Sequence, residues 1–224
     1  MEKITVLTPS SGSHLLEEAH RSVLNQTIKC RHVIVNDGKD TRLFDRYRST
    51  AHVIDLPDNT HQGEWYGHRI YADITSLIDA DFLCFLDEDN TYQENHVEVS
   101  VNHCRGQKFA WSYRNLMTEA GAIVGIDDFE SICDPYEAGY ALIDTSGWTF
   151  SRDGMYLCKY IKGKWGADRK LTEEVLDIFN MAHVRSRCTS QHTYNYRMPQ
   201  RLEAFFRKRM KLQAVTGDTT AFSV

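Results

Sequence analysis

Short apolar segments alternate with amphipathic ones along the first hundred residues. Segments rich in apolar and β-branched residues, typical of strands, occupy 4–8, 31–36, 51–55 and 81–86. Apolar residues recur at helical spacing over 14–26, 42–49 and 64–78. Strands joined through helices in this way become parallel neighbours, with right-handed connections. The pattern therefore predicts an α/β fold built on a doubly wound, mostly parallel sheet flanked by helices.

The second half has a looser pattern, which predicts a small second sheet. Its expected strands are 108–113, 122–126, 140–144 and 183–189, with a turn at 145–148. Its expected helices are 94–104, 152–162 and a segment from Thr172 to about Met181, and 164–169 is expected to be a loop.

The most apolar segment, Phe82 to Leu86, leads directly into Asp87, Glu88 and Asp89. An uninterrupted apolar run of this length fits a strand buried on both faces. Three carboxylates at its end cannot all be buried without a counter-charge, because an unpaired buried carboxylate is costly. A divalent cation, Mn²⁺ or Mg²⁺, matches several oxygen ligands at one place. A solvated acidic turn is the alternative that this motif alone leaves open.

Two other polar clusters end strands in the same half of the chain. Thr8-Pro9 follows the first strand and Asp37-Gly38 the second. Ligands of open α/β sheets bind beyond the carboxyl ends of the strands, so these clusters and the acids are expected to share one crevice. A dinucleotide site of the dehydrogenase kind is disfavoured, since no G-x-G-x-x-G follows the first strand and no Walker A lysine is present.

Composition narrows the class of protein. The 224 residues are 42% hydrophobic and 25% charged, which is ordinary for a globular protein. A net charge of −5 and a pI near 6.0 argue against nucleic acid as a partner. No apolar run approaches the ~20 residues that span a bilayer, and no signal-peptide pattern opens the chain. Six cysteines without a C-x-x-C pair favour reduced thiols. We therefore expect a cytoplasmic protein, soluble or peripherally associated with a membrane.

A final helix is expected over about 199–215. Leu202, Phe205 and Phe206 form an apolar stripe on it, and basic residues crowd the remaining surface. The helix either packs on the body with a solvated basic face or contacts an anionic membrane surface.

These segments resemble the inverting family-two nucleotide-sugar glycosyltransferases, which have the GT-A fold. The resemblance lies in Thr8-Pro9, Ser22-Val23-Leu24-Asn25-Gln26-Thr27, Val35-Asn36-Asp37-Gly38 and Phe85-Leu86-Asp87-Glu88-Asp89, the last of which is similar to the family's D-x-D motif. Gly63 followed by Gly67-His68-Arg69 is similar to its G…A-R-N segment, with His68 where arginine is usual and Arg69 displaced by one. The resemblance covers roughly residues 3–100. Beyond them, Gly166-Ala167-Asp168-Arg169 resembles the acidic catalytic segment, where Ala167 replaces the usual Glu and leaves Asp168 alone.

The resemblance implies roles for these residues. Asp37 would accept a hydrogen bond from the nucleobase and Asp87 would lie by the ribose, in a nucleotide site with Thr8, Pro9, Gly38, His68, Arg69 and Glu88. Asp89 would bind Mn²⁺ or Mg²⁺, and His192, in a polar segment that fits a mobile flap, could complete its shell. Asp168 would be the base that deprotonates the acceptor, with Asp144, Asp127 and Asp128 as alternatives. Of the aromatic residues Trp111, Tyr113, Trp148 and Trp165, most are expected in the core and the rest against a sugar.

The activity implied is transfer of a sugar, with inversion, from a nucleoside-diphosphate sugar (in the first place a UDP sugar) to a hydroxyl of a carbohydrate or glycoconjugate. The chain would be a single domain over 1–224, with a nucleotide-binding half at 1–100, an acceptor-binding half at 101–198 and a C-terminal helix and tail at 199–224. A nucleotidyltransferase acting on sugar phosphates and a non-catalytic sugar-nucleotide-binding domain are the alternatives. The first normally has a basic Gly-rich loop after the first strand, which Pro9-Ser10-Ser11-Gly12 lacks.

Overall fold

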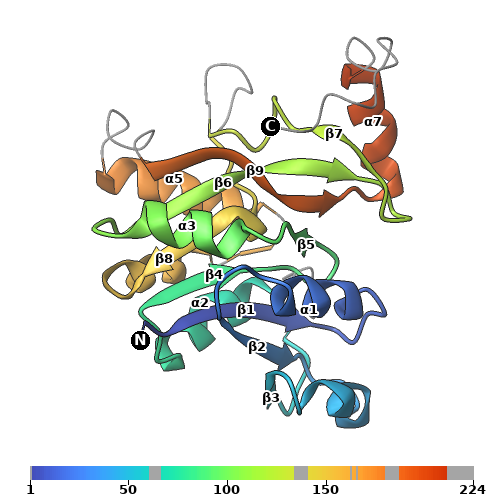
Figure 1. Cartoon of the computed structure of the whole chain (residues 1–224), viewed down its shortest axis with the longest axis vertical. Coiled ribbons are helices and arrows are strands. Elements are labelled where there is room, and N and C mark those ends of the chain that lie inside the picture. The colour runs from blue at the N-terminus through green and yellow to red at the C-terminus, as the bar shows by residue number, and fades with distance from the viewer. Residues whose placement is uncertain are drawn as a thin grey trace.

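The computed structural model describes residues 2–60, 67–133, 141–161, 163–164, 166–179 and 187–210. Within them, nine strands form one sheet in the order β3-β2-β1-β4-β8-β6-β9-β5, with β7 paired to β6 (Figure 1). The strands are β1 Ile4–Ser10, β2 Arg31–Asn36, β3 His52–Asp55, β4 Phe82–Phe85, β5 Thr91–Tyr92, β6 Phe109–Met117, β7 Ile123–Ile126, β8 Trp148–Ser151 and β9 Cys188–Arg197. The first four strands in chain order are parallel, β8 is antiparallel to both β4 and β6, and β9 runs parallel to β6.

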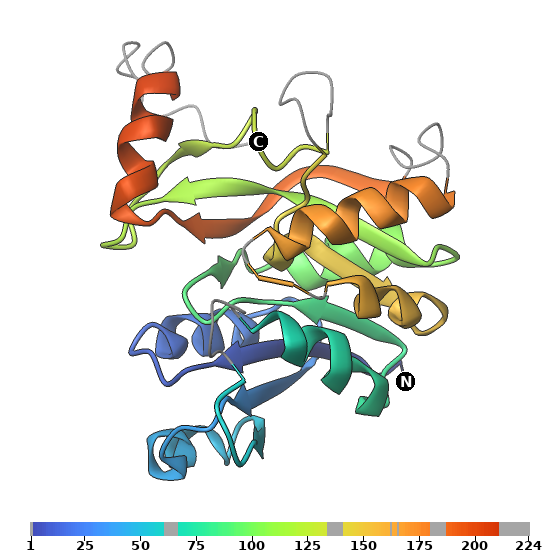
Figure 2. The same ribbon diagram turned by 180° about the vertical axis from the view of Figure 1, so that it is seen from behind.

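Helices cover both faces of this sheet, as the views from the two sides show (Figures 1 and 2). The α-helices are α1 Leu16–Leu24, α2 His68–Ile74, α3 His96–Cys104, α5 Ala167–Phe179 and α7 Gln200–Met210. The 3₁₀ segments are η1 Thr41–Tyr47, η2 Thr75–Leu77, η3 Thr145–Gly147 and η4 Arg152–Tyr160. None of the helices in the described residues is long and apolar enough to cross a membrane.

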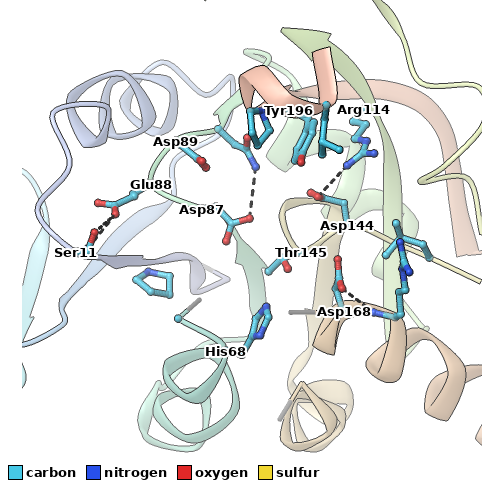
Figure 3. A pocket seen from close by; sticks show the side chains of 18 of the residues that line it. Ser11, His68, Asp87, Glu88, Asp89, Arg114, Asp144, Thr145, Asp168 and Tyr196 are labelled. Atoms are coloured by element: carbon cyan, nitrogen blue, oxygen red, sulfur yellow. Dashed lines mark hydrogen bonds and ion pairs between the residues drawn. The ribbon is translucent and has the colours of Figure 1, made fainter. Parts of the chain in front are cut away.

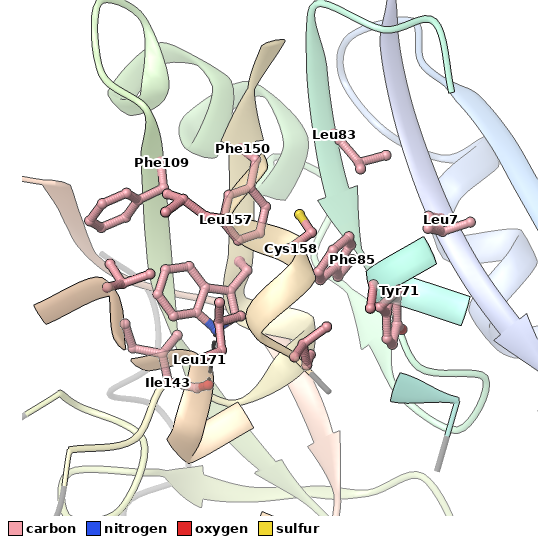
Figure 4. Packing of buried hydrophobic residues seen from close by; sticks show 14 of the residues in the cluster. Leu7, Tyr71, Leu83, Phe85, Phe109, Ile143, Phe150, Leu157, Cys158 and Leu171 are labelled. Atoms are coloured by element: carbon pink, nitrogen blue, oxygen red, sulfur yellow. Dashed lines mark hydrogen bonds between the residues drawn. The ribbon is translucent and has the colours of Figure 1, made fainter. Parts of the chain in front are cut away.

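Strand β4 is buried on both faces, as its sequence predicts. Leu83 and Phe85 face a core shared with α2, η4 and α5, where Tyr71 and Leu157 pack (Figure 4). Phe82 and Cys84 face the opposite core, which α1 and α3 complete. Because successive side chains of a strand point to opposite faces, this strand fills two cores at once.

The elements expected in the first half are confirmed, with two refinements. The helix expected over 42–49 is the 3₁₀ segment η1, and the one expected over 64–78 comprises α2 and η2, with 64–66 outside the described residues. In the second half, the expected strands 108–113 and 122–126 are β6 and β7, and the segment 152–162 is the 3₁₀ segment η4.

Three predictions for the second half are wrong. Residues 141–144 form no strand, because Asp144 accepts a hydrogen bond from the Ser146 amide (3.2 Å) and caps η3; the turn expected at 145–148 is η3, and the strand β8 follows it. Residues 190–196 lie in β9 and are no irregular flap, while most of the strand expected at 183–189 lies outside the described residues. The strands of this half also continue the first sheet through the β4–β8 pairing, so the separate small sheet is absent from the described part.

Gly154 in η4 gives a test of the packing between η4 and the sheet. A Cβ at this position would lie 1.7 Å from the Lys108 carbonyl oxygen, a backbone atom that cannot swing away. We expect Gly154→Ala to lower the free energy of unfolding by about 3 kcal/mol in denaturant titrations. Gly163→Ala is the control, since its Cβ would meet only Ala167 at 3.5 Å, an ordinary contact. Equal effects of the two substitutions would contradict this account.

Candidate active site

A cavity of about 330 Å³ opens beyond the carboxyl ends of the parallel strands. Seven of the residues singled out in the sequence line it: Pro9, Asp37, His68, Asp87, Glu88, Asp89 and Asp168. Its other walls come from the start of α5, the segment before β8, and the junction of β9 with α7, which contribute Arg169, Asp144, Thr145, Tyr196, Arg201 and Leu202. Figure 3 shows the carboxylates of Asp87, Asp89, Asp144 and Asp168 around this space.

Glu88 ties two loops of the cavity together. Its carboxylate accepts hydrogen bonds from the Ser10 and Ser11 hydroxyls (2.6 and 2.7 Å) and from the Ser11 and Ser13 amides (3.1 Å each). These four bonds fix the loop after β1 onto the loop after β4. Each carboxylate oxygen of Glu88 accepts two of these bonds, so the role of Glu88 in the site is structural.

Asp87 is held by groups from both halves of the chain. It accepts hydrogen bonds from the Tyr71 hydroxyl (2.9 Å) and the Ser146 hydroxyl (3.1 Å), and its own amide donates to the Ser146 oxygen (3.1 Å). Burial raises its pKa well above the ordinary value, and the charges of Asp144 and Asp89 add to the rise. A ligand that brings positive charge or hydrogen-bond donors would relieve this repulsion.

The loop that carries Asp89 is clamped by Arg197, the last residue of β9. The guanidinium donates to the Asp89 carbonyl (2.9 Å), to the Glu119 carbonyl (2.6 Å) and to the Glu18 carboxylate (2.5 Å). The Arg197 amide also donates to Asn90 (2.9 Å). The Asp89 side chain stays at the cavity, where burial raises its pKa to about 6 and the charge of Glu88 adds to the effect.

Arg114, a buried arginine in β6, was not foreseen from the sequence. It makes ion pairs with Asp127 (2.7 Å), Glu130 (2.6 Å) and Asp144 (3.1 Å), and it stacks on the Tyr196 ring at 4.0 Å. A basic residue inside an otherwise apolar strand segment is the signal that could have drawn attention to it.

The ion pairs of Arg114 distinguish two of the alternative candidates for the base, Asp127 and Asp144. Asp127 is buried beside Arg114, which holds its pKa below the usual range despite burial, and it does not line the cavity. Asp144 does line the cavity, and burial raises its pKa to about 6 against the opposing charge of Arg114. Asp128 is exposed and is not among the residues lining the cavity.

Asp168 lies in the first turn of α5, so the prediction that 164–169 is a loop is wrong for this residue. Its carboxylate accepts a hydrogen bond from the Arg169 amide (2.9 Å) and points toward Asp144 (Figure 3). Burial raises its pKa, although the Arg169 amide and nearby His68 oppose the rise. The ring of His68 is fixed by its Nδ1, which donates to the Gly163 carbonyl (3.1 Å).

Among the residues expected to bind the nucleotide, Asp37 is 2% exposed and accepts a hydrogen bond from the Thr60 amide (2.6 Å). Gly38 does not line the cavity; with φ at +68° and a Cβ position 2.3 Å from the Asn59 nitrogen, it permits a close backbone crossing. Thr8 is buried and bonded to the His32 ring (2.9 Å). Arg69 is exposed on α2. These three residues thus lie outside the cavity lining.

His192 is not brought next to Asp89. It lies in β9 with its ring 5.3 Å from that of Tyr113, and it does not line the cavity. Trp111 and Trp148 are core residues, and Trp165 lies outside the described part.

The cavity is lined by carboxylate oxygens, the type of ligand that hard divalent cations prefer. The pKa values of Asp87, Asp89 and Asp144 are raised there, so a cation would relieve an unfavourable concentration of negative charge. Among the residues that the structure describes, however, no three histidine, cysteine or carboxylate side chains converge as a ready-made metal site. A cation would therefore be held by Asp89 together with oxygens that a ligand or a movement of the acidic loop supplies.

No family model and no curated protein matches the sequence. Among solved structures, the fold is similar to S. aureus TarS, with a TM-score of 0.57 and 15% identity over 95% of this chain and 39% of that one. Residues 1–349 of TarS give TM-scores of 0.57 in complex with UDP and 0.56 in complex with UDP-GlcNAc, each at 14% identity over 95% of this chain and over 64% and 66% of the TarS chain. The present chain thus spans 39% of the TarS chain in the first of these structures and about two thirds of the 1–349 fragment in the others. The likeness confirms the α/β fold expected from the sequence.

The raised pKa of Asp89 predicts a stability change that depends on pH. A carboxyl whose pKa rises on folding destabilises the folded state increasingly as pH rises through that pKa. In metal-free buffer at pH 8, we expect Asp89→Asn to be more stable than the wild type by up to about 3 kcal/mol, the equivalent of two pKa units. The gap should shrink to about half at pH 5 and close only below about pH 4, where the carboxyl is protonated in the unfolded protein as well. The buried histidines are common to both proteins and cancel in the difference.

Urea titrations between pH 5 and 8 measure this gap. Asp58→Asn, a substitution on an exposed loop, is the matched control and should show no gap at either pH. A gap for Asp89→Asn that is constant with pH would contradict the assignment.

Proposed function

We propose that the chain is a glycosyltransferase that moves a sugar from a nucleoside-diphosphate sugar to an acceptor hydroxyl with inversion. The observation that carries this proposal is the arrangement around one cavity: Asp37, Asp87 and Asp89 follow the parallel strands, and Asp168 begins the helix across from them. The shared fold with TarS, a protein solved with UDP and with UDP-GlcNAc, supports a sugar nucleotide as the ligand. The first half of the chain would bind the nucleotide and the second half the acceptor.

The donor would lie along the parallel strands. Asp37, which lines the cavity, would offer a carboxylate oxygen to the nucleobase. Asp87 offers another to the ribose, and Asp89 would hold Mn²⁺ or Mg²⁺. When bound, the ion supplies positive charge to the diphosphate as it leaves. His68 at the start of α2 faces the same space.

Asp168 would take the proton of the acceptor hydroxyl. A raised pKa makes a carboxylate a stronger base, and its burial at the cavity removes competing water. The proton would move to an Asp168 oxygen while the hydroxyl oxygen attacks the anomeric carbon from the side opposite the diphosphate, which inverts that centre. Asp144 adds negative charge nearby and so favours protonation of Asp168.

Donor binding can be measured by thermal unfolding with UDP, GDP, dTDP and their sugars, with and without Mn²⁺. A ligand at 100 times its Kd stabilises the folded state by about 2.7 kcal/mol, enough for a clear rise in Tm. We expect a rise with a UDP compound that is larger with Mn²⁺ present, and Asp89→Ala should remove the metal-dependent part. If all three nucleotides leave Tm unchanged with metal present, the transferase proposal fails.

Asp168→Asn separates binding from chemistry. This substitution preserves size and removes the base, so the Tm rise with donor should remain while the turnover rate falls 10²–10⁴-fold. Donor hydrolysis and sugar transfer to an acceptor mixture are the readouts. Asp153→Asn, at an exposed position in η4, is the control and should retain full turnover. Full activity of Asp168→Asn with loss of activity in Asp144→Asn would assign the base to Asp144.

A further inference from the structure

Helix α7 carries a local charge opposite to that of the whole chain. Its eleven residues include four basic side chains and one acidic one, a net charge of +3, whereas the chain carries −5. The helix lies at one end of the molecule, with β3 at the opposite end (Figure 1). The helix therefore carries a local positive charge on an acidic protein.

One face of α7 is anchored in the body of the protein. Phe206 is buried against Leu116 and Met198, and Leu202 packs against the same cluster. These contacts fix the orientation of the helix on β6 and β9. The opposite face is consequently held outward.

The outward face combines an aromatic side chain with cations. Phe205 is 50% exposed, and Arg201 and Lys208 are exposed without an ion pair to any described residue. The neighbouring Arg207 and Arg209 are engaged within the protein, by Glu203 (2.7 Å) and by the Phe129 ring (3.7 Å). A half-exposed phenylalanine beside exposed cations that form no ion pair with a described residue suits a helix that contacts a membrane interface.

The same helix forms a wall of the cavity. Arg201 and Leu202, in its first turn, line the cavity, and Arg197, three residues before the helix begins, clamps the Asp89 loop. A surface bound to α7 would therefore lie beside the cavity.

We propose that α7 docks on an anionic lipid bilayer, with Phe205 at the acyl boundary and Lys208 among the headgroups. The cavity then opens next to the membrane. If the proposed transferase function holds, its acceptor is a glycoconjugate presented at that surface. Nucleic acid is a poorer fit, because a patch of +3 on an acidic chain gives few phosphate contacts and offers no role for an exposed phenylalanine.

Co-sedimentation of the full chain with vesicles tests the docking. We expect binding to vesicles with 30% phosphatidylglycerol, weak binding to pure phosphatidylcholine, and loss in 0.5 M NaCl. Lys208→Glu should weaken binding about 10-fold or more, since each basic residue near an anionic surface contributes about 5-fold and the substitution reverses the charge. Phe205→Ser should weaken it about as much.

Two matched controls lie elsewhere on the surface. Lys29→Glu changes charge by the same amount at another exposed lysine, and Leu77→Ser removes an apolar side chain that is 78% exposed. Neither should affect vesicle binding. Hydrogen exchange should slow at the α7 amides in the presence of vesicles and stay unchanged in α2.

Several results would overturn the proposal: no binding to anionic vesicles, equal binding to neutral ones, or equal losses in the control variants. Binding to single-stranded RNA that matches the vesicle affinity and ignores Phe205→Ser would assign the surface to nucleic acid. The experiment requires no sugar nucleotide, so its outcome is independent of the donor-binding test. A protein that binds UDP but not vesicles would keep its proposed function and lose this one.

Discussion

The position of the cavity depends on strand β4, whose register is fixed by packing on both of its faces. Leu83 and Phe85 of β4 fill one core while Phe82 and Cys84 fill the other, so a shift of one residue would expel both sets from their cores. The chain that follows must therefore emerge at a fixed point on the sheet edge. The chain places Asp87 and Asp89 at that point, where hydrogen bonds from Tyr71, Ser146 and Arg197 hold their loop.

Most of the positive charge near the cavity is already committed to the protein itself. Arg114 forms ion pairs with Asp127 and Glu130 as well as with Asp144. Arg197 donates hydrogen bonds to loop carbonyls and to the Glu18 carboxylate. The carboxylates facing the open space consequently repel one another and are poorly solvated. The packing of the surrounding cores keeps these carboxylates close together despite their repulsion. A cationic or hydrogen-bond-donating ligand would bind more favourably because it reduces that repulsion.

How far the sequence could predict this site depends on the range of the interactions involved. The acids after β4 follow from a local pattern, an apolar run that ends in carboxylates, and the structure places them at the cavity. Thr8 was misplaced because neighbouring strand residues point to opposite faces, and a motif does not say which face the ligand takes. The ion pairs of Arg114 could not be predicted, since its partners Asp127 and Asp144 lie 13 and 30 residues away in the sequence. In the same way, the cap that Asp144 forms on η3 turned an expected strand into a loop.

Arg197 joins parts of the chain that are synthesised far apart. It lies 108 residues beyond Asp89 and 179 beyond Glu18, and it bonds to both. On the ribosome, the strands β1 to β4 emerge and can pair before β9 does, because their contacts are closer in sequence. Until then the acidic loop has no clamp and the cavity lacks the wall that Tyr196 and α7 provide. A nascent chain can therefore pair its parallel strands before it completes its ligand site.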